Sequence, residues 1–419
     1  MLKAKANEFN DGVTDDFNPS EMSQMSRRKF ITLLTASAAF TATSCSDYRD
    51  KGELVPYTNR PENVQPGQAN YYASTCNGCS QACGILVKTR EGRPIKIDGN
   101  PDHPISKGKI CTTGQASVLN LYDPERLTDP IWNNRKSSWK EVDQKIIELL
   151  QRYAEDGKEI AVITNRVNSP TTRKVFEEFR KKYLYVNVNF YSYESVNDSI
   201  KRSAWAKCYG GGDIPAVKWE DANVVVALDS DFLGREGDTI ENIRRFTAGR
   251  NVMKSSDFNR LYSVESGLSL TGMNADKRIR LRPDAQFDFV MSLLSELIIN
   301  KNFKRIEYPI RQKLTDYSLD KFSKDYNIPK KKLTTLLNDV LDNPNKAIFH
   351  AGESLPEEVH VAVNFLNEVI DSTTLYDYEN PKPIKNLLSD KEEWDQLINS
   401  INRGNVGAII TFDADPIYH

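Results

Sequence analysis

Short apolar runs alternate with longer amphipathic stretches from residue 138 onward. The runs at 160–163, 223–229 and 261–264 are typical of buried parallel strands, and residues 185–190 alternate as a strand does. Between these runs we expect three helices, which are 139–153, a helix opened by Ser169-Pro170 and ending near 182, and a polar helix ending near 208. Strands that alternate with helices predict a parallel sheet covered on both faces.

The pattern becomes helical after Pro283. Helices are expected at 284–300, 308–325 and 329–342, and a strand at 347–350 with a helix at 356–370 then restores the α/β alternation. The run 406–412 predicts one more buried strand, seven residues before the last residue. Because a parallel strand normally leads into a crossover helix, we expect this second unit to be incomplete or the gene to be split.

A different pattern precedes these units. Residues 84–100 alternate as the two strands of a β-hairpin do, with the turn at Glu91-Gly92. The residues from Pro101 to Pro104 then predict a rigid loop that leads back toward Cys111.

Four of the six cysteines flank this hairpin with the spacing C-x2-C-x3-C-x27-C, at Cys76, Cys79, Cys83 and Cys111. Thiolates suit tetrahedral zinc or a cubane iron–sulfur cluster. The cluster is favoured because the first three cysteines fall within one short loop. The small or polar residues between them allow backbone N–H groups to approach sulfide, whereas a structural zinc site more often uses two separated C-x2-C pairs. A zinc site, disulfides or inert thiols remain the alternatives.

Composition narrows the class of protein. The chain has 419 residues, 56 basic and 58 acidic, and a net charge of −2, with 39% hydrophobic residues. These values are typical of a globular protein of two or three domains and give no support to nucleic-acid binding. The concentration of cysteines in one region argues against a disulfide scaffold.

The first 70 residues predict export. Arg27 and Arg28 precede a mildly apolar run, 31–40, that is too short to span a bilayer, and this order is typical of a twin-arginine signal. Small residues before Cys45 suggest a lipobox and acylation of Cys45; the alternative is a free thiol in a removed signal. We therefore expect a signal at 1–45 and an extended linker at 46–70.

The cysteine spacing, the Arg90-to-Arg93 turn, the Gly99-to-Pro104 loop and Gly108-x-x-Cys111-x-x-Gly114-Gln115 together resemble the cluster domain of the molybdopterin oxidoreductases. The resemblance implies a small cluster-binding β domain at 71–130, followed by doubly wound parallel-sheet α/β domains at 131–283 and 284–419. Further segments resemble the B subunit of alternative complex III and the polysulfide reductase-like enzymes, and they are 55–62, 66–73, 169–171, 228–234, 246–250 and 264–278.

This resemblance implies a [4Fe-4S] cluster on the four cysteines in an electron-transfer subunit of a respiratory oxidoreductase. The alternatives are a catalytic molybdopterin-dependent subunit of the polysulfide reductase type, which would bind molybdopterin guanine dinucleotide, and a structural zinc protein. The expected partners are ferredoxin-like subunits and integral membrane quinone-interacting subunits. The expected location is the periplasmic side, associated with the membrane.

Two positions lead us to expect no molybdenum. The family commonly has Lys or Arg two residues after the fourth cysteine, where this chain has Thr113. The family's metal ligand is expected before the polar helix, where the chain offers Ser195 but no cysteine, and Cys208 lies about 20 Å further along that helix.

Other candidate sites are weaker. Gly210-to-Asp213 lacks the Lys-Ser/Thr of a phosphate loop and is expected to be an ordinary loop. His103 is expected to support the structure of its loop. Glu265, Asn274 and Asp276 fall where the family contacts its dinucleotide; the alternative is a loop held by its own side-chain hydrogen bonds.

Overall fold

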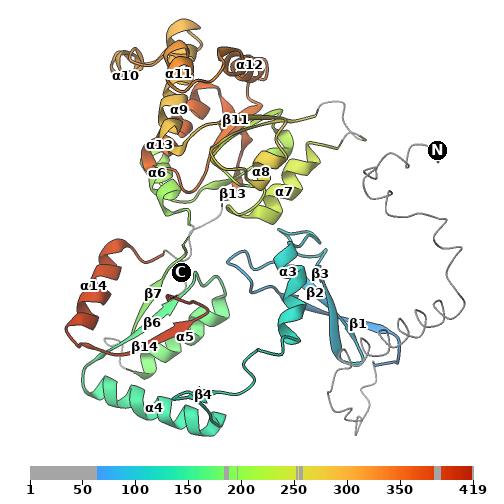
Figure 1. Cartoon of the computed structure of the whole chain (residues 1–419), viewed down its shortest axis with the longest axis vertical. Coiled ribbons are helices and arrows are strands. Elements are labelled where there is room, and N and C mark those ends of the chain that lie inside the picture. Colours follow the sequence, from blue (N-terminus) through green and yellow to red (C-terminus); the bar gives the residue numbers. More distant parts are fainter. Residues whose placement is uncertain are drawn as a thin grey trace, which may run out of the picture. The chain divides into compact units, whose positions relative to one another are not determined.

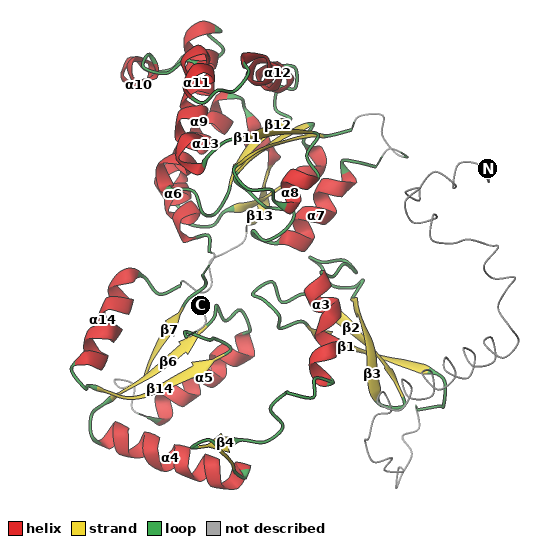
Figure 2. Ribbon diagram, in the orientation of Figure 1, coloured by secondary structure: helices red, strands yellow, loops and turns green. Residues whose placement is uncertain are grey.

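The computed structural model describes residues 64–183, 188–195, 197–251, 253, 258–381 and 388–417. The predictions for Arg27, Arg28 and Cys45, and for most of the linker, lie outside the described residues. Figure 1 follows the chain by colour and Figure 2 by type of element.

A small antiparallel sheet comes first. It has the order β1-β2-β3, and its strands are β1 (Ala69–Thr75), β2 (Gly84–Arg90) and β3 (Arg93–Gly99). Glu91 and Gly92 both have positive φ, 51° and 82°, as a two-residue hairpin turn with the right-handed twist of its strands requires. The predicted hairpin is confirmed. After β3 the chain forms α3 (Thr112–Ala116) and a 3-10 turn, Ser117–Leu121.

The next sheet is parallel and has the order β14-β6-β7. Its strands are β6 (Glu159–Thr164), β7 (Val188–Ser192) and β14 (Val406–Phe412), and its helices are α4 (Trp139–Glu155), α5 (Pro170–Lys182) and α14 (Lys391–Asn402). Residues of α4 and α5 pack with Ile160 and Val162 on one face, and α14 packs with Ala161 and Ile163 on the other. The sheet is therefore covered on both faces.

The larger sheet is also parallel, with the order β11-β10-β9-β12. Its strands are β9 (Val224–Leu228), β10 (Arg260–Glu265), β11 (Lys277–Arg280) and β12 (Ala347–Ala351). One face packs on α9 (Gln286–Ser295), α11 (Leu319–Asp325), α12 (Lys330–Leu341) and α13 (Glu357–Val369). The other face packs against residues of α6 (Ser199–Tyr209), α7 (Thr239–Ala248) and the buried Trp219 and Phe232.

The remaining elements are short. They are β4 (Ile131–Trp132) paired with β5 (Arg135–Lys136), β8 (Pro215–Val217) paired with β13 (Tyr376–Pro381), α8 (Leu270–Met273), α10 (Tyr308–Leu314), the 3-10 segments Trp219–Asp221, Pro283–Ala285 and Ser372–Leu375, and a π-helical turn, Glu296–Asn300.

Local chemistry explains the helix boundaries. Ser138 and Glu141 form a capping box at the start of α4, and Ser169 caps α5 with Pro170 in its first turn, as predicted. The single helix expected at 308–325 is wrong. It is divided into α10 and α11 because Ser318 adopts an extended conformation and caps a new helix by accepting the N–H of Lys321 at 3.1 Å.

The mixed α/β class, with a small antiparallel sheet before parallel sheets, is confirmed. The strands of both parallel sheets come from both sides of residue 283, because β14 pairs with β6 and β12 pairs with β9. β14 is an edge strand with Ile409 49% exposed, so the expectation of a buried strand at 406–412 is wrong. Within the described part of the chain, no helix combines the length and the hydropathy needed to cross a membrane.

Candidate metal centre

The first three cysteines lie on the connection between β1 and β2. Because Thr75 pairs with Gly84 in the sheet, the connection from Cys76 to Cys83 is a closed hairpin loop. The N–H of Cys76 donates to the carbonyl of Cys83 at 2.8 Å, and Ala82 adopts a positive φ of 47° to complete the turn. The loop therefore holds three thiols on one short, hydrogen-bonded segment.

The fourth cysteine is placed by the loop that follows β3. Cys111 is the N-cap of α3, and its Sγ accepts the N–H of Gly114 at 3.3 Å. Upstream, His103 Nδ1 accepts the N–H of Ser106 at 3.1 Å, and the His103 ring packs against Gly84 so closely that a Cβ there would lie 2.8 Å from it. His103 thus supports the loop, as the sequence predicted.

The four thiols interact electrostatically. Burial raises the pKa of Cys79, and it raises the pKa of Cys83 to about 11, with further increases from Cys76 and Cys111. Thiolates gathered in this way repel one another until a cationic group neutralises them, so the donor set fits an iron–sulfur cluster. All four are free thiols. Among the described residues, no group of three or more His, Cys, Asp or Glu side chains forms a ligand set for a single ion.

The other cysteine of the described α/β region lies elsewhere. Cys208 is in the last turn of α6, and its Sγ accepts a hydrogen bond from Asn364 Nδ2 at 3.6 Å. Gly210 ends this helix with a left-handed C-cap, and the glycine-rich segment leads into β8 rather than into a helix. Both features agree with the structural interpretation of this segment.

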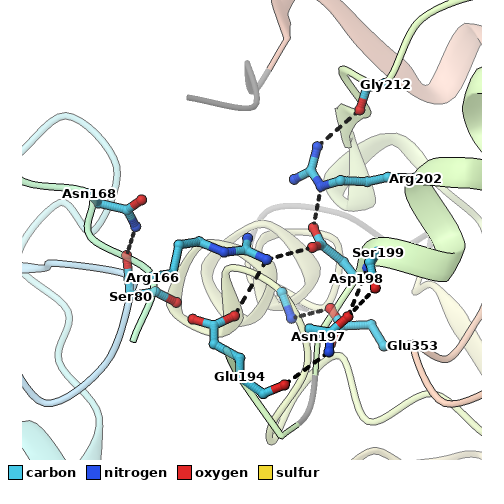
Figure 3. A network of polar contacts seen from close by, with 11 residues as sticks. Ser80, Arg166, Asn168, Glu194, Asn197, Asp198, Ser199, Arg202, Gly212 and Glu353 are labelled. Atoms are coloured by element: carbon cyan, nitrogen blue, oxygen red, sulfur yellow. Dashed lines mark hydrogen bonds and ion pairs between the residues drawn. The ribbon is translucent and has the colours of Figure 1, made fainter. Parts of the chain in front are cut away.

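A network of ion pairs occupies the segment between β7 and α6, where the family's molybdenum ligand is expected (Figure 3). Asp198 accepts from Arg166 at 3.0 Å and from Arg202 at 2.6 Å, and Glu194 lies 3.5 Å from Arg166. Ser195 is exposed. The carboxylates of this segment are therefore neutralised by arginines of the same chain.

This region also contacts the cysteine loop. The side-chain amide of Asn168, which follows β6, donates to the carbonyl of Ser80 (Figure 3). Gln81 Nε2 donates to the carbonyl of Gly237 at 2.9 Å. Both contacted residues of the loop lie between ligand candidates, so the α/β region directly supports the cysteine loop.

A second polar network was missed by sequence reasoning. Its members are Lys201, Ser230, Glu236, His350 and Glu353. Ser230 follows β9, and Glu353 follows β12, at the carboxyl ends of neighbouring parallel strands. Polar residues at such strand ends are the signal that could have identified these positions.

The loop after β10 holds itself together. Glu265 is buried and accepts from Ser269 Oγ and Arg278 Nε, both at 2.5 Å, while Asp276 accepts the N–H of Leu261 at 2.7 Å. Asn274 donates to the carbonyl of Leu270 at 2.8 Å. This geometry favours the interpretation of a loop stabilised by its own side chains.

Comparisons with known proteins agree with the cysteine pattern. Residues 69–123 match the family described as Molybdopterin oxidoreductase Fe4S4 domain. The chain is 27% identical over 259 residues to a sulfite dehydrogenase polypeptide of Allochromatium vinosum, covering 57% of this chain and 25% of that protein. It is 26% identical over 243 residues to the menaquinone reductase molybdopterin-binding-like subunit of Nitratidesulfovibrio vulgaris, covering 57% of this chain and 34% of that protein. The chain thus spans a quarter to a third of the length of these relatives.

Proposed function

Because the chain belongs to the molybdopterin oxidoreductase family, we propose that it relays electrons through a [4Fe-4S] cluster bound by Cys76, Cys79, Cys83 and Cys111. The observation that carries the proposal is the meeting of four thiols from two separate segments, within the region that matches an Fe4S4 domain. Such a cluster, when bound, accepts and releases single electrons.

The residues around the thiols have separate tasks in this proposal. The loop closed by Cys76 and Cys83 sets the spacing of three ligands, and the N–H of Gly114 stabilises negative charge on Cys111 Sγ. Gly78 lies beside Cys76, where a Cβ would be 3.6 Å from Sγ, so the loop backbone passes close to the sulfur. The relay thus depends on a preformed shell of backbone donors.

We further propose that molybdenum is not part of this relay. The segment before α6 offers no thiol among its described residues, and its carboxylates Glu194 and Asp198 are paired with Arg166 and Arg202. A metal ligand must be available with its own lone pair and charge, and these groups are already engaged. Thr113, in the first turn of α3, supplies no cation next to the cluster.

The wider assembly is also a proposal. Arg27, Arg28 and Cys45 support export by the twin-arginine route and an acyl anchor on the periplasmic side. The segments that resemble alternative complex III support a membrane-associated respiratory complex with ferredoxin-like and quinone-interacting subunits. The names of the two relatives, which refer to a sulfite dehydrogenase and to a menaquinone reductase, agree with redox work but do not specify a substrate for this chain.

Elemental analysis tests the proposal directly. Full-length protein purified without oxygen is expected to contain about four irons and four sulfides and to give a paramagnetic signal when reduced. Cys79→Ser should lose the cluster, whereas Cys208→Ser, at a thiol outside the candidate site, should retain it. Stoichiometric zinc in place of iron would replace the relay by a structural zinc site. Stoichiometric molybdenum that is lost in Ser195→Ala would favour a catalytic role instead.

Export and anchoring need their own experiment. Replacing Arg27 and Arg28 together with lysine is expected to retain the precursor in the cytoplasm, because the twin-arginine pair is the recognition element. Mass spectrometry of the exported protein should find an acylated Cys45. Undiminished export of the double variant, or an unmodified mature terminus at another residue, would contradict this part of the proposal.

A further inference from the structure

The polar network of Lys201, Ser230, Glu236, His350 and Glu353 lies one residue away from the cysteine loop. Gly237 connects the two: its N–H donates to Glu353 Oε1 at 3.0 Å, and its carbonyl accepts from Gln81 Nε2 at 2.9 Å. Gln81 lies between Cys79 and Cys83. Gly237 has a φ of 60°, in the region that favours glycine, so this position suits the residue that bridges them.

From this geometry we propose that Glu353 takes up one proton from solvent when the adjacent cluster accepts one electron, and releases it when the cluster is reoxidised. The inference rests on the proposed cluster. The step is balanced, because the electron comes from a one-electron donor and the carboxylate oxygen gains the proton. The negative charge added at the cluster is thereby offset by the charge lost at Glu353.

The hydrogen bonds of the network exclude its other members as the proton acceptor. Lys201 Nζ lies 2.7 Å from His350 Nε2, and His350 Nδ1 lies 2.9 Å from Ser230 Oγ. Ser230 Oγ donates to Glu236 at 2.8 Å. An ammonium can only donate, so His350 Nε2 accepts from Lys201, and Nδ1–H then donates to Ser230. His350 therefore has no nitrogen left for a further proton.

The charges that face Glu353 are unbalanced in the same direction. Lys201 supplies one positive charge from α6, while Glu236 supplies a negative charge from the loop before α7. Asp198, at the start of α6, adds negative charge but is itself paired with Arg166 and Arg202. One ammonium next to two carboxylates leaves a surplus negative charge until one carboxylate is protonated.

The titration of Glu353 falls in the physiological range. Burial, together with the negative charge of Glu236, raises its pKa to about 7 despite the attraction of Lys201. Burial and the neighbouring ammonium hold the pKa of His350 well below its ordinary value, and burial likewise lowers the pKa of His360 on α13. Neither imidazole competes with Glu353 for the proton.

Redox titration at several pH values tests the inference. The full-length protein is titrated anaerobically with dithionite and mediators between pH 5.5 and 8.5, and the reduced cluster is followed by electron paramagnetic resonance. We expect the midpoint potential to fall as pH rises through the window around pH 7. Full coupling is a tenfold change in the reduction equilibrium per pH unit, or 59 mV. Partial coupling gives a smaller slope in the same window.

Two variants identify the group responsible. Glu353→Gln should abolish the slope and keep the potential near the acid limit of the wild type, because the amide mimics the protonated acid. Lys201→Met should move the window to higher pH, because it removes the charge that lowers the pKa of Glu353. Glu358→Gln, at an exposed carboxylate in the first turn of α13, is the matched control and should leave the slope unchanged.

The outcomes separate the two proposals. Absence of iron and of the paramagnetic signal would overturn the proposed cluster. A cluster whose potential is independent of pH, or a slope that persists in Glu353→Gln, would overturn only the proton uptake. If Glu353→Gln fails to fold, Lys201→Met decides: an upward shift of the window supports Glu353, and an unmoved or downward-shifted window rejects it.

Discussion

Gly99 controls the fourth ligand although it lies far from it in sequence. A Cβ at Gly99 would lie 2.5 Å from the carbonyl carbon and oxygen of Gly108 and 2.7 Å from the carbonyl of Lys109. Ordinary contact begins at 3.4 Å, so Gly99→Ala requires a backbone shift of about 0.9 Å. That backbone leads directly to Cys111, and sites of this kind tolerate displacements of only about 0.5 Å.

We expect this overpacking to cost about 1–3 kcal/mol, which corresponds to a roughly 5- to 150-fold weaker hold on the cluster. Gly78→Ala is the matched control. Gly78 lies inside the cysteine loop itself, yet a Cβ there would meet Cys76 Sγ at 3.6 Å and Thr113 at 4.0 Å, in ordinary contact. A residue between the ligands should thus tolerate alanine, whereas one at the end of β3 should not.

The assay is the iron content of protein purified without oxygen, with far-UV circular dichroism to verify that the parallel sheets remain folded. Gly99→Ala should lose most of its iron at unchanged α/β content, and Gly78→Ala should retain the wild-type amount. A Gly99→Ala protein with a full complement of iron would refute the argument, and so would a Gly78→Ala protein that loses its cluster while Gly99→Ala keeps it.

Three further predictions concern stability. Asn367 binds both the N–H and the carbonyl of Phe349 at the edge of β12, at 3.0 and 2.9 Å, so Asn367→Leu should lower the free energy of unfolding by about 2–6 kcal/mol in urea titrations, with Asn364→Leu as the control that loses only a weak N–H···S bond. The raised pKa of Glu353, about 7, means that the folded state binds more protons than the unfolded state, so stability should fall as pH rises from about 4.5 to 7, and Glu353→Gln should lose about 2–3 kcal/mol less over this range. Ser138→Ala removes the capping box of α4 and should cost about 0.5–2 kcal/mol, measured as the shift of the same urea midpoint; an unchanged midpoint would contradict the role of the cap.

Sequence reasoning succeeded where a local pattern determines the structure. The buried strands β6 and β9 are continuous apolar runs because helices cover both faces of their sheets, and such runs are visible in the sequence. The hairpin turn at Glu91-Gly92 and the caps at Ser138 and Ser169 depend on residues within a few positions of one another. The cysteine pattern was likewise readable because its spacing is part of the motif.

The pairing of distant strands could not be read in the same way. Nothing local in 406–412 specifies β6 as its partner, and the sequence assigned this strand to a separate unit. The polar network was missed for a related reason. Lys201 occurs in an ordinary polar helix and Glu353 in an ordinary loop, and only the convergence of β9 and β12 brings them together. Chemistry that depends on tertiary convergence leaves little trace in a single sequence.

The pairing of β14 with β6 has a consequence for how the protein is made. Ser400 donates to Glu159 across 241 residues, so the sheet cannot be completed until nearly the whole described chain has been synthesised. At about 5–20 residues per second, β6 and β7 wait roughly 10–50 s on the ribosome before β14 arrives. During that time β6 presents the edge of a fully apolar strand, Ile160 to Ile163, to the cytosol. Production of this protein should therefore depend on a chaperone that holds the nascent chain, more strongly than its composition alone would suggest.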